Sequence, residues 1–392
     1  MKRDTLLILN GGHSEIPLIH AGKKMGFRVF TSGNDPHAIG HRYADGYLPA
    51  DFSDETAVSA LIDKHGIDFV IPSCNDFSIL TASALKQQYD IGRFDDYETT
   101  VMLHHKSAFK TVAQTLGLSV AKSVSLHRND DISDLRLKYP LIVKPIDLSG
   151  GKGVTKVETD AALQNAVDTA FHYSREDTVL IEEFIEGSHH SASLLIRNGK
   201  VVFKFFADEY FYLNNFLVEG AYSNPSIDSD IQTAILDDTK TIIEHFRLAD
   251  GILHIQFVLR NGTPYILEVT RRSPGDLYLD LVSHSTGIDF AQAVIGLHTG
   301  KCDLPLQHTQ QRSYILRHCV MADRNGMLKH IHIDKRFETQ ICDRLFWYND
   351  GDKIDNFLAY KAGIVFASFD DMQTLKAALS DIHTLIRTEV TA

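Results

Sequence analysis

Short apolar runs alternate with helical patterns over the first hundred residues. Strands are predicted at 5–10, 27–32, 46–51 and 68–73. Helices are predicted after the first strand, as far as about residue 25, and at 54–66. Alternation of this kind is typical of a parallel sheet whose right-handed crossovers place helices on both faces. Ligands of such sheets bind at the carboxyl ends of the strands, which here carry Asn10, Asn34-Asp35 and Ser73-Cys74-Asn75-Asp76.

A different pattern follows from about residue 100. Asn198-Gly199 and Asn261-Gly262 each divide a stretch rich in apolar and β-branched residues, so they predict tight β-hairpins. Helices are expected at 160–173 and at roughly 228–247. Beyond residue 305 the pattern indicates a smaller α+β region. The sequence contains neither internal repeats nor a low-complexity linker.

In the stretch YPLIVKPIDLSGGKGVTKV, residues 139–157, an apolar run predicts a buried strand that carries Lys144. A glycine-rich turn follows it. It does not match a P-loop, because Gly153 follows Lys152 where Ser or Thr is required. A glycine turn between antiparallel strands can still cover phosphates, since bare backbone N–H groups approach the oxygens closely. Lys144 would then neutralise phosphate charge. A surface hairpin with a lysine that extends into solvent explains the same pattern equally well.

The hairpin at 252–270 favours the phosphate interpretation. Gln256 and Glu268 lie on its two strands, and an oxygen ligand on each of two adjacent strands can hold a Mg²⁺ bound to nucleotide phosphates. Arg272 follows four residues after Glu268 and could clamp an anionic substrate or a developing acyl phosphate. For Glu268 alone, the alternative is a solvated strand carboxylate.

The order of these features resembles the ATP-grasp superfamily, and within it the carboxylate–amine ligases related to L-amino acid ligases. The resemblance covers almost the whole chain, from residue 5 to beyond 370. Its most specific segments are HHKSAFK, LIVKPIDLSGGKGV, VLIEEFIEG, HIQF and ILEVTRR.

The resemblance implies a role for each matching residue. Lys106 and Lys144 would contact the nucleotide phosphates, and Arg272 would steady the acyl phosphate. Gln256 and Glu268 would hold Mg²⁺. The mobile phosphate loop would comprise Ser149, Gly150, Gly151, Lys152, Gly153 and Val154. The hinge whose backbone reads the adenine edge would comprise Glu182, Glu183, Phe184 and Ile185.

Three positions depart from the usual family pattern. Gln256 stands where an acidic residue is common, although carbamoyl-phosphate synthetase-like members also use Gln. Thr270 replaces an Asn that often ligates the metal, and His189 replaces the ribose-binding acid, as in biotin carboxylase-like members. These departures indicate a retained but adjusted metal site, in which Gln256→Glu should be tolerated.

The composition limits the kinds of partner that we expect this protein to bind. The 392 residues carry a formal net charge of −12, which argues against nucleic-acid binding. No apolar run approaches the length of a membrane span, and the run at 5–9 is too short for a signal-peptide core. The four cysteines show no CxxC spacing. We therefore expect a cytoplasmic protein without a membrane partner.

Together these observations predict an α/β and α+β protein with three parts. Residues 1–98 would form a parallel-sheet pre-ATP-grasp domain. Residues 99–187 and 188–392 would form two α+β subdomains of an ATP-grasp fold that clasp the nucleotide, the second including the C-terminal region.

The predicted enzyme uses ATP and one or two Mg²⁺ ions, with Mn²⁺ as a substitute, to join a small carboxylate to an amine. It would form an amide or peptide bond and release ADP and phosphate. Asp276 is one candidate base for the amine, and a homodimer is an open alternative to a monomer. Two other functions remain: a purine-pathway-like carboxylase or formyl-type ligase, and a non-catalytic ATP-binding regulatory module.

Overall fold

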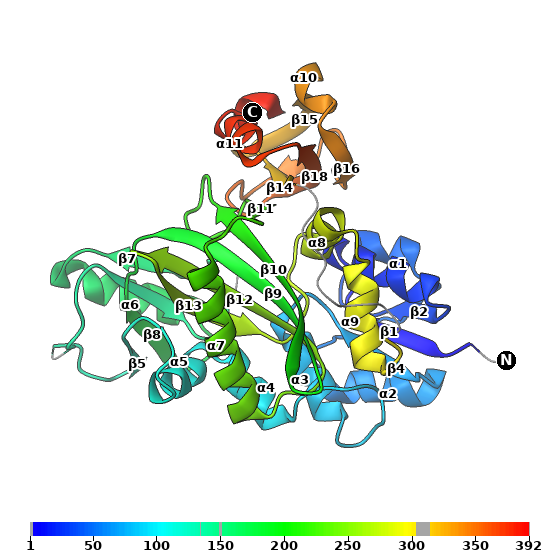
Figure 1. The fold of residues 1–392 in the computed structure, drawn as a ribbon, viewed down its shortest axis with the longest axis horizontal. Coiled ribbons are helices and arrows are strands. Elements are labelled where there is room, and N and C mark those ends of the chain that lie inside the picture. The colour runs from blue at the N-terminus through cyan, green and yellow to red at the C-terminus, as the bar shows by residue number, and fades with distance from the viewer. Residues whose placement is uncertain (1–2, 134, 149–150, 303–313, 392) are drawn as a thin grey trace.

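The computed structural model describes residues 3–133, 135–148, 151–302 and 314–391 (Figure 1). The large β subdomain lies between a small β subdomain and an N-terminal α/β domain, and a further C-terminal sheet packs at its end (Figure 1). None of the described helices combines the length and apolarity needed to cross a membrane.

The N-terminal domain contains the predicted parallel sheet, in the order β3-β2-β1-β4. Its strands are β1 (Thr5–Leu9), β2 (Arg28–Thr31), β3 (Gly46–Tyr47) and β4 (Phe69–Pro72). Its helices are η1 (His13–Glu15), α1 (Ile16–Lys24), η2 (Ile39–Tyr43), α2 (Glu55–His65) and α3 (Asp76–Leu85). The Asp54 and Asn75 side chains cap α2 and α3 by accepting backbone N–H groups, which fixes where both helices begin. The third strand is shorter than the sequence predicts.

The small subdomain is a four-stranded antiparallel sheet in the order β5-β8-β6-β7. Its strands are β5 (Ser123–His127), β6 (Leu141–Pro145), β7 (Thr155–Val157) and β8 (Thr178–Glu183), and α6 (Asp160–Tyr173) covers one face. Apolar residues of α6 and the strands form a separate core, so this subdomain is a compact unit. Helices α4 (Tyr97–His104) and α5 (Lys106–Thr115) precede it but pack against the large sheet, through residues such as Leu103 and Phe109.

The large sheet has eight strands in the order β13-β12-β9-β10-β11-β14-β18-β16. They are β9 (Ser188–Arg197), β10 (Lys200–Tyr210), β11 (Gly220–Ser223), β12 (Gly251–Arg260), β13 (Thr263–Thr270), β14 (Tyr314–Met321), β16 (Ile341–Phe346) and β18 (Lys361–Phe369). Both predicted hairpins form, because Asn198-Gly199 and Asn261-Gly262 adopt the positive φ that a type I′ turn needs.

Helices cover both faces of the large sheet (Figure 1). Helix α7 (Ser229–Phe246) packs on one face, and its buried isoleucines join a core with β9, β12 and β13. Helices α8 (Tyr278–Thr286) and α9 (Phe290–Thr299) lie on the other face, between the sheet and the N-terminal domain, where α9 contacts α1 and β4. One continuous core therefore joins the N-terminal domain to the large sheet.

The C-terminal region adds a three-stranded sheet in the order β17-β15-β19. Its strands are β15 (Gly326–Ile333), β17 (Lys353–Ile354) and β19 (Ile386–Thr391), and its helices are α10 (Lys335–Glu338), α11 (Met372–Ser380) and α12 (Ile382–Leu385). Because β14, β16 and β18 belong to the large sheet, this region continues the large subdomain.

Candidate active site

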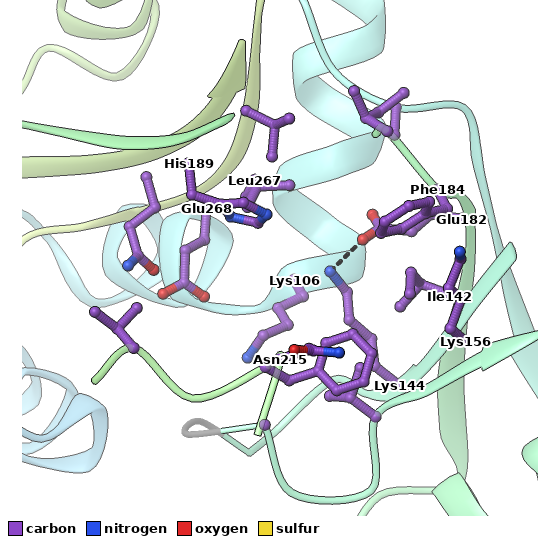
Figure 2. Close-up of a pocket in the computed structure, with 18 of the residues that line it drawn as sticks. Lys106, Ile142, Lys144, Lys156, Glu182, Phe184, His189, Asn215, Leu267 and Glu268 are labelled. Atoms are coloured by element: carbon purple, nitrogen blue, oxygen red, sulfur yellow. Dashed lines mark hydrogen bonds and ion pairs between the residues drawn. The ribbon is translucent and has the colours of Figure 1, made fainter. Parts of the chain in front are cut away.

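A cavity of about 560 Å³ lies between the small subdomain and the large sheet (Figure 2). Most of the residues singled out from the sequence line it: Lys106, Lys144, Gly151, Val154, Glu182, Glu183, Phe184, Ile185, His189, Gln256 and Glu268. They come from five separate segments of the chain, so the fold rather than the local sequence brings them together.

Two lysines enter the cavity from the small-subdomain side (Figure 2). Lys144 projects from β6, and its Nζ donates to Oε1 of Glu182 at 2.5 Å. Lys106 stands at the start of α5, and its Nζ donates to the backbone oxygen of Leu148 at 2.6 Å. Both ammonium groups are thus held at the cavity wall, where they can meet anionic phosphate oxygens.

A third lysine, Lys110, lies behind the wall and was missed in the sequence. It is 1% exposed; its Nζ lies 3.3 Å from Oε2 of Glu182 and donates to the Ile266 oxygen at 3.0 Å. Burial lowers the pKa of Lys110. Burial alone would raise the pKa of Glu182, but the charges of Lys110 and Lys144 outweigh it and lower that pKa to about 2. The sequence did carry a signal for Lys110: it follows Lys106 by four residues, which places both lysines on one face of a helix.

The predicted hinge begins with Glu182 and Glu183 at the end of β8 and continues through Phe184 and Ile185, and all four residues line the cavity. The N–H groups of Glu183 and Phe184 already donate to the oxygens of Lys122 and Pro140. Ile185 lies beyond the strand, and its N–H makes no hydrogen bond to another described residue. Phe184, Ile142 and Leu267 give this end of the cavity apolar walls, and Lys156 Nζ lies 4.4 Å from the Phe184 ring centroid. A flat heterocycle fits these surroundings.

The glycine turn connects β6 to β7, which pair as the predicted antiparallel strands. Gly151 has φ = +72°, and a Cβ there would lie 2.7 Å from the backbone oxygen of Phe216, so a larger residue would clash. Gly151 and Val154 line the cavity, whereas Lys152 and Gly153 do not. Ser149 and Gly150 lie outside the described residues.

Oxygen donors line the large-sheet wall opposite the lysines. Gln256 and Glu268 are direct register partners on β12 and β13, and both line the cavity. The Thr270 hydroxyl, two residues beyond Glu268, is buried without a hydrogen-bond partner among the described residues. Carboxylate, amide and hydroxyl oxygens beside phosphate-binding lysines suit Mg²⁺. No three His, Cys, Asp or Glu side chains in the described ranges converge as a metal site, so phosphates and water would complete the coordination.

Glu209 also lines this wall but was not selected as a site residue from the sequence. Both of its carboxylate oxygens accept from Nε2 of Gln256, at 3.1 and 2.9 Å. Burial raises the pKa of Glu209, and the nearby charge of Glu268 acts in the same direction. The acidic pair Asp208-Glu209 inside the aromatic run 205–211 was a signal that this strand borders a cleft.

Arg272 does not line this cavity. Its Nε donates to Oδ1 of Asp76 at 2.9 Å, and Nη1 donates to the Ser273 oxygen at 3.1 Å. Burial alone would lower the pKa of Arg272, but the Asp76 charge more than offsets this. The guanidinium therefore links β13 to the start of α3 in the N-terminal domain. Among the described residues nothing accepts from Nη2, which leaves one edge of the fork for a substrate.

Asp276 is poorly suited to the role of base. Its Oδ2 accepts from Lys361 at 2.5 Å, and Oδ1 lies 3.3 Å from Nε2 of His13. Burial alone would raise the pKa of Asp276, but the Lys361 charge outweighs it and holds the pKa far below its usual range. So acidic a carboxyl group is a weak proton acceptor at neutral pH.

Comparisons with known proteins identify the domain that holds this cavity. A model of the ATP-grasp domain matches residues 111–275. Formate-dependent phosphoribosylglycinamide formyltransferase of Synechococcus sp. (strain CC9902) is 26% identical over 206 residues, covering 51% of this chain and 52% of that protein. The chain thus spans about half the length of this curated relative.

Solved structures show the same fold over the whole chain. The L-amino acid ligase from Bacillus licheniformis superposes with a TM-score of 0.83 at 18% identity, covering 100% of both chains. N5-carboxyaminoimidazole synthetase from Staphylococcus aureus, complexed with ADP, gives a TM-score of 0.77 at 17% identity over 97% of both chains. The match assigns an ATP-grasp domain to residues 111–275, and the solved structures share the fold of the whole chain.

Proposed function

We propose that this chain is an ATP-dependent carboxylate–amine ligase that activates a small acid as an acyl phosphate and joins it to an amine. The observation that carries the proposal is the single cavity in which Lys106 and Lys144 face Gln256 and Glu268. Cations on one wall and oxygen donors on the other suit a nucleotide whose phosphates lie between them. The likeness to the L-amino acid ligase fold supports an amino acid or a related acid as substrate.

In the proposed reaction the protein's own residues bind and orient the substrates. Ile185 and the apolar walls would hold the adenine, and Lys144 and Lys106 would neutralise phosphate charge. Mg²⁺ held by Gln256 and Glu268 would screen the repulsion between the γ-phosphate and the substrate carboxylate. The free edge of Arg272 would hold that carboxylate and then the acyl phosphate.

Closure of the glycine turn would protect the reaction. An acyl phosphate hydrolyses when water reaches it, so the cavity must exclude water before the amine attacks. Gly151 lies against the backbone of Phe216, which belongs to the large subdomain, so this glycine already meets the opposite wall of the cavity. Amine attack would then form the amide and release phosphate, with ADP as the second product.

The proposal is tested by ADP release from the wild-type protein with Mg²⁺ and a panel of acids and amines. We expect ADP to form only when a suitable acid and amine are both present, together with an amide product. Glu268→Gln should remove most turnover, because the cation loses its anionic ligand. Tight ATP binding without ADP formation under any condition would contradict the proposal and favour a regulatory ATP-binding module.

A second candidate is a formyl- or carboxylase-type ligase of the purine-pathway kind. The match to the formate-dependent formyltransferase is the observation that favours it. Formate or bicarbonate would then replace the larger acid, and ADP release would respond to these ions instead of amino acids. The same assay panel therefore separates the two candidates. For either, we propose a cytoplasmic enzyme with ATP and Mg²⁺ as cofactors.

A further inference from the structure

Glu209 reaches the cavity wall of Gln256 and Glu268 from β10, a strand that does not neighbour β12 or β13. It lies on β10, opposite His189 of β9, whereas Gln256 lies on β12, opposite Ser191 of β9. Strand β9 therefore runs between them, and the two side chains meet above it. The contact is bidentate, since Gln256 Nε2 donates to both carboxylate oxygens at 3.1 and 2.9 Å.

This contact orients the Gln256 amide. Because Nε2 is held by Glu209, the amide oxygen Oε1 is directed away from that carboxylate, and no described residue donates a hydrogen bond to it. An oxygen that accepts no other hydrogen bond is available to a hard cation. Residues that orient a ligand in this way commonly decide its affinity for the metal.

Glu209 also adds a second carboxyl group to this cavity wall. Two half-buried carboxylates, Glu209 and Glu268, flank the neutral Gln256 in the same cavity. Carboxylates on one cavity wall repel each other unless a cation compensates their charge. The wall thus carries two carboxyl groups although its β12 residue is neutral.

We propose that Glu209 is a positioning residue of the metal site: it orients Gln256 towards the cation and supplies the negative charge that Gln256 lacks. This inference rests on the proposed function, because it requires a nucleotide and a divalent cation in the cavity. It assigns to β10 a role in a site otherwise built from β12 and β13.

The test is Mn²⁺ affinity of the ADP-bound protein, measured by electron paramagnetic resonance of free Mn²⁺. Glu209→Gln should weaken Mn²⁺ binding by about tenfold or more, while ADP affinity without divalent cations stays at least as high as in the wild type. The charge swap Glu209→Gln with Gln256→Glu should return Mn²⁺ affinity to within about threefold of the wild type. Glu244→Gln, which removes an exposed carboxylate of α7, is the matched charge control and should change nothing.

Rescue by the swap separates a charge effect from damage to the fold. Wild-type Mn²⁺ affinity in Glu209→Gln, or a swap variant that binds as weakly as Glu209→Gln, would overturn the inference. If Glu268→Gln loses Mn²⁺ and Glu209→Gln does not, the inference fails and the proposed function survives. If the wild type binds neither ADP nor Mn²⁺, both fail.

Discussion

Replacing Lys110 with Met tests the buried charge cluster behind the nucleotide cavity. The change keeps most of the side-chain volume and removes the ammonium. Glu182 then keeps the ion pair with Lys144, and the Ile266 oxygen loses a donor. Breaking a buried ion pair from one side typically costs about 3–5 kcal/mol.

The pKa of Glu182 gives a second measure of the same cluster. A fall from 4.5 to about 2 corresponds to roughly 3 kcal/mol of stabilisation. Because the folded-state pKa is depressed, this stability is present above pH 4.5 and is lost as the pH falls towards 2. In Lys110→Met the depression should shrink, so less stability should be lost on acidification.

The assay is urea unfolding of the wild type, Lys110→Met, Glu182→Gln and the double variant at pH 7 and at acidic pH. We expect Lys110→Met to lose about 3 kcal/mol at pH 7 and the double variant to lose much less than the sum of the single losses. A loss within about 0.5 kcal/mol for Lys110→Met, or additive losses in the double variant, would refute this account of the cluster.

Three further predictions concern the cavity and its surroundings. Lys144→Ala should weaken ATP binding by roughly 1.5–3 kcal/mol, and calorimetry that finds unchanged affinity would contradict its placement at the phosphates. Arg272→Lys can keep an ion pair with Asp76 but loses the planar fork, so amide formation should fall about tenfold or more while ATP affinity stays nearly constant; equal losses of both would count against its role at the acid substrate. Burial raises the pKa of Glu219 to about 8, so its contribution to stability is present below pH 4.5 and is lost as the pH rises through 8. Glu219→Gln should therefore unfold at higher urea than the wild type at pH 9 but at a similar concentration at pH 4, and identical shifts at both pH values would show that the buried carboxyl group is not the cause.

Local patterns predicted the parts of this fold that local chemistry decides. The apolar runs gave the parallel sheet, and the two Asn-Gly pairs gave both hairpins because only a few residue types tolerate positive φ. The two-residue loop fixes the register of the second hairpin only as far as Phe257 and Ile266. A β-bulge beyond that point brings Glu268 opposite Gln256, and the turn alone does not predict it.

Contacts across the fold could not be predicted in this way. Lys110 meets Glu182 because α5 packs behind β8, and Arg272 meets Asp76 because the N-terminal domain packs beside β13. The local pattern of apolar and polar residues predicts neither pairing. The Arg271 side chain, next to Arg272, likewise turns inward to Asp95 at 2.6 Å, a contact that no local pattern indicates.

The most direct test of the proposed chemistry follows oxygen from the acid substrate. With a carboxylate labelled with ¹⁸O in both oxygens, attack on the γ-phosphate transfers one labelled oxygen into the phosphate leaving group, and the other stays in the amide. We predict that ³¹P NMR of the products of the wild-type protein, with ATP, Mg²⁺ and an amine, shows phosphate carrying one ¹⁸O for each amide formed. Amide formation with unlabelled phosphate, or phosphate release with no acid requirement, would contradict the acyl phosphate route.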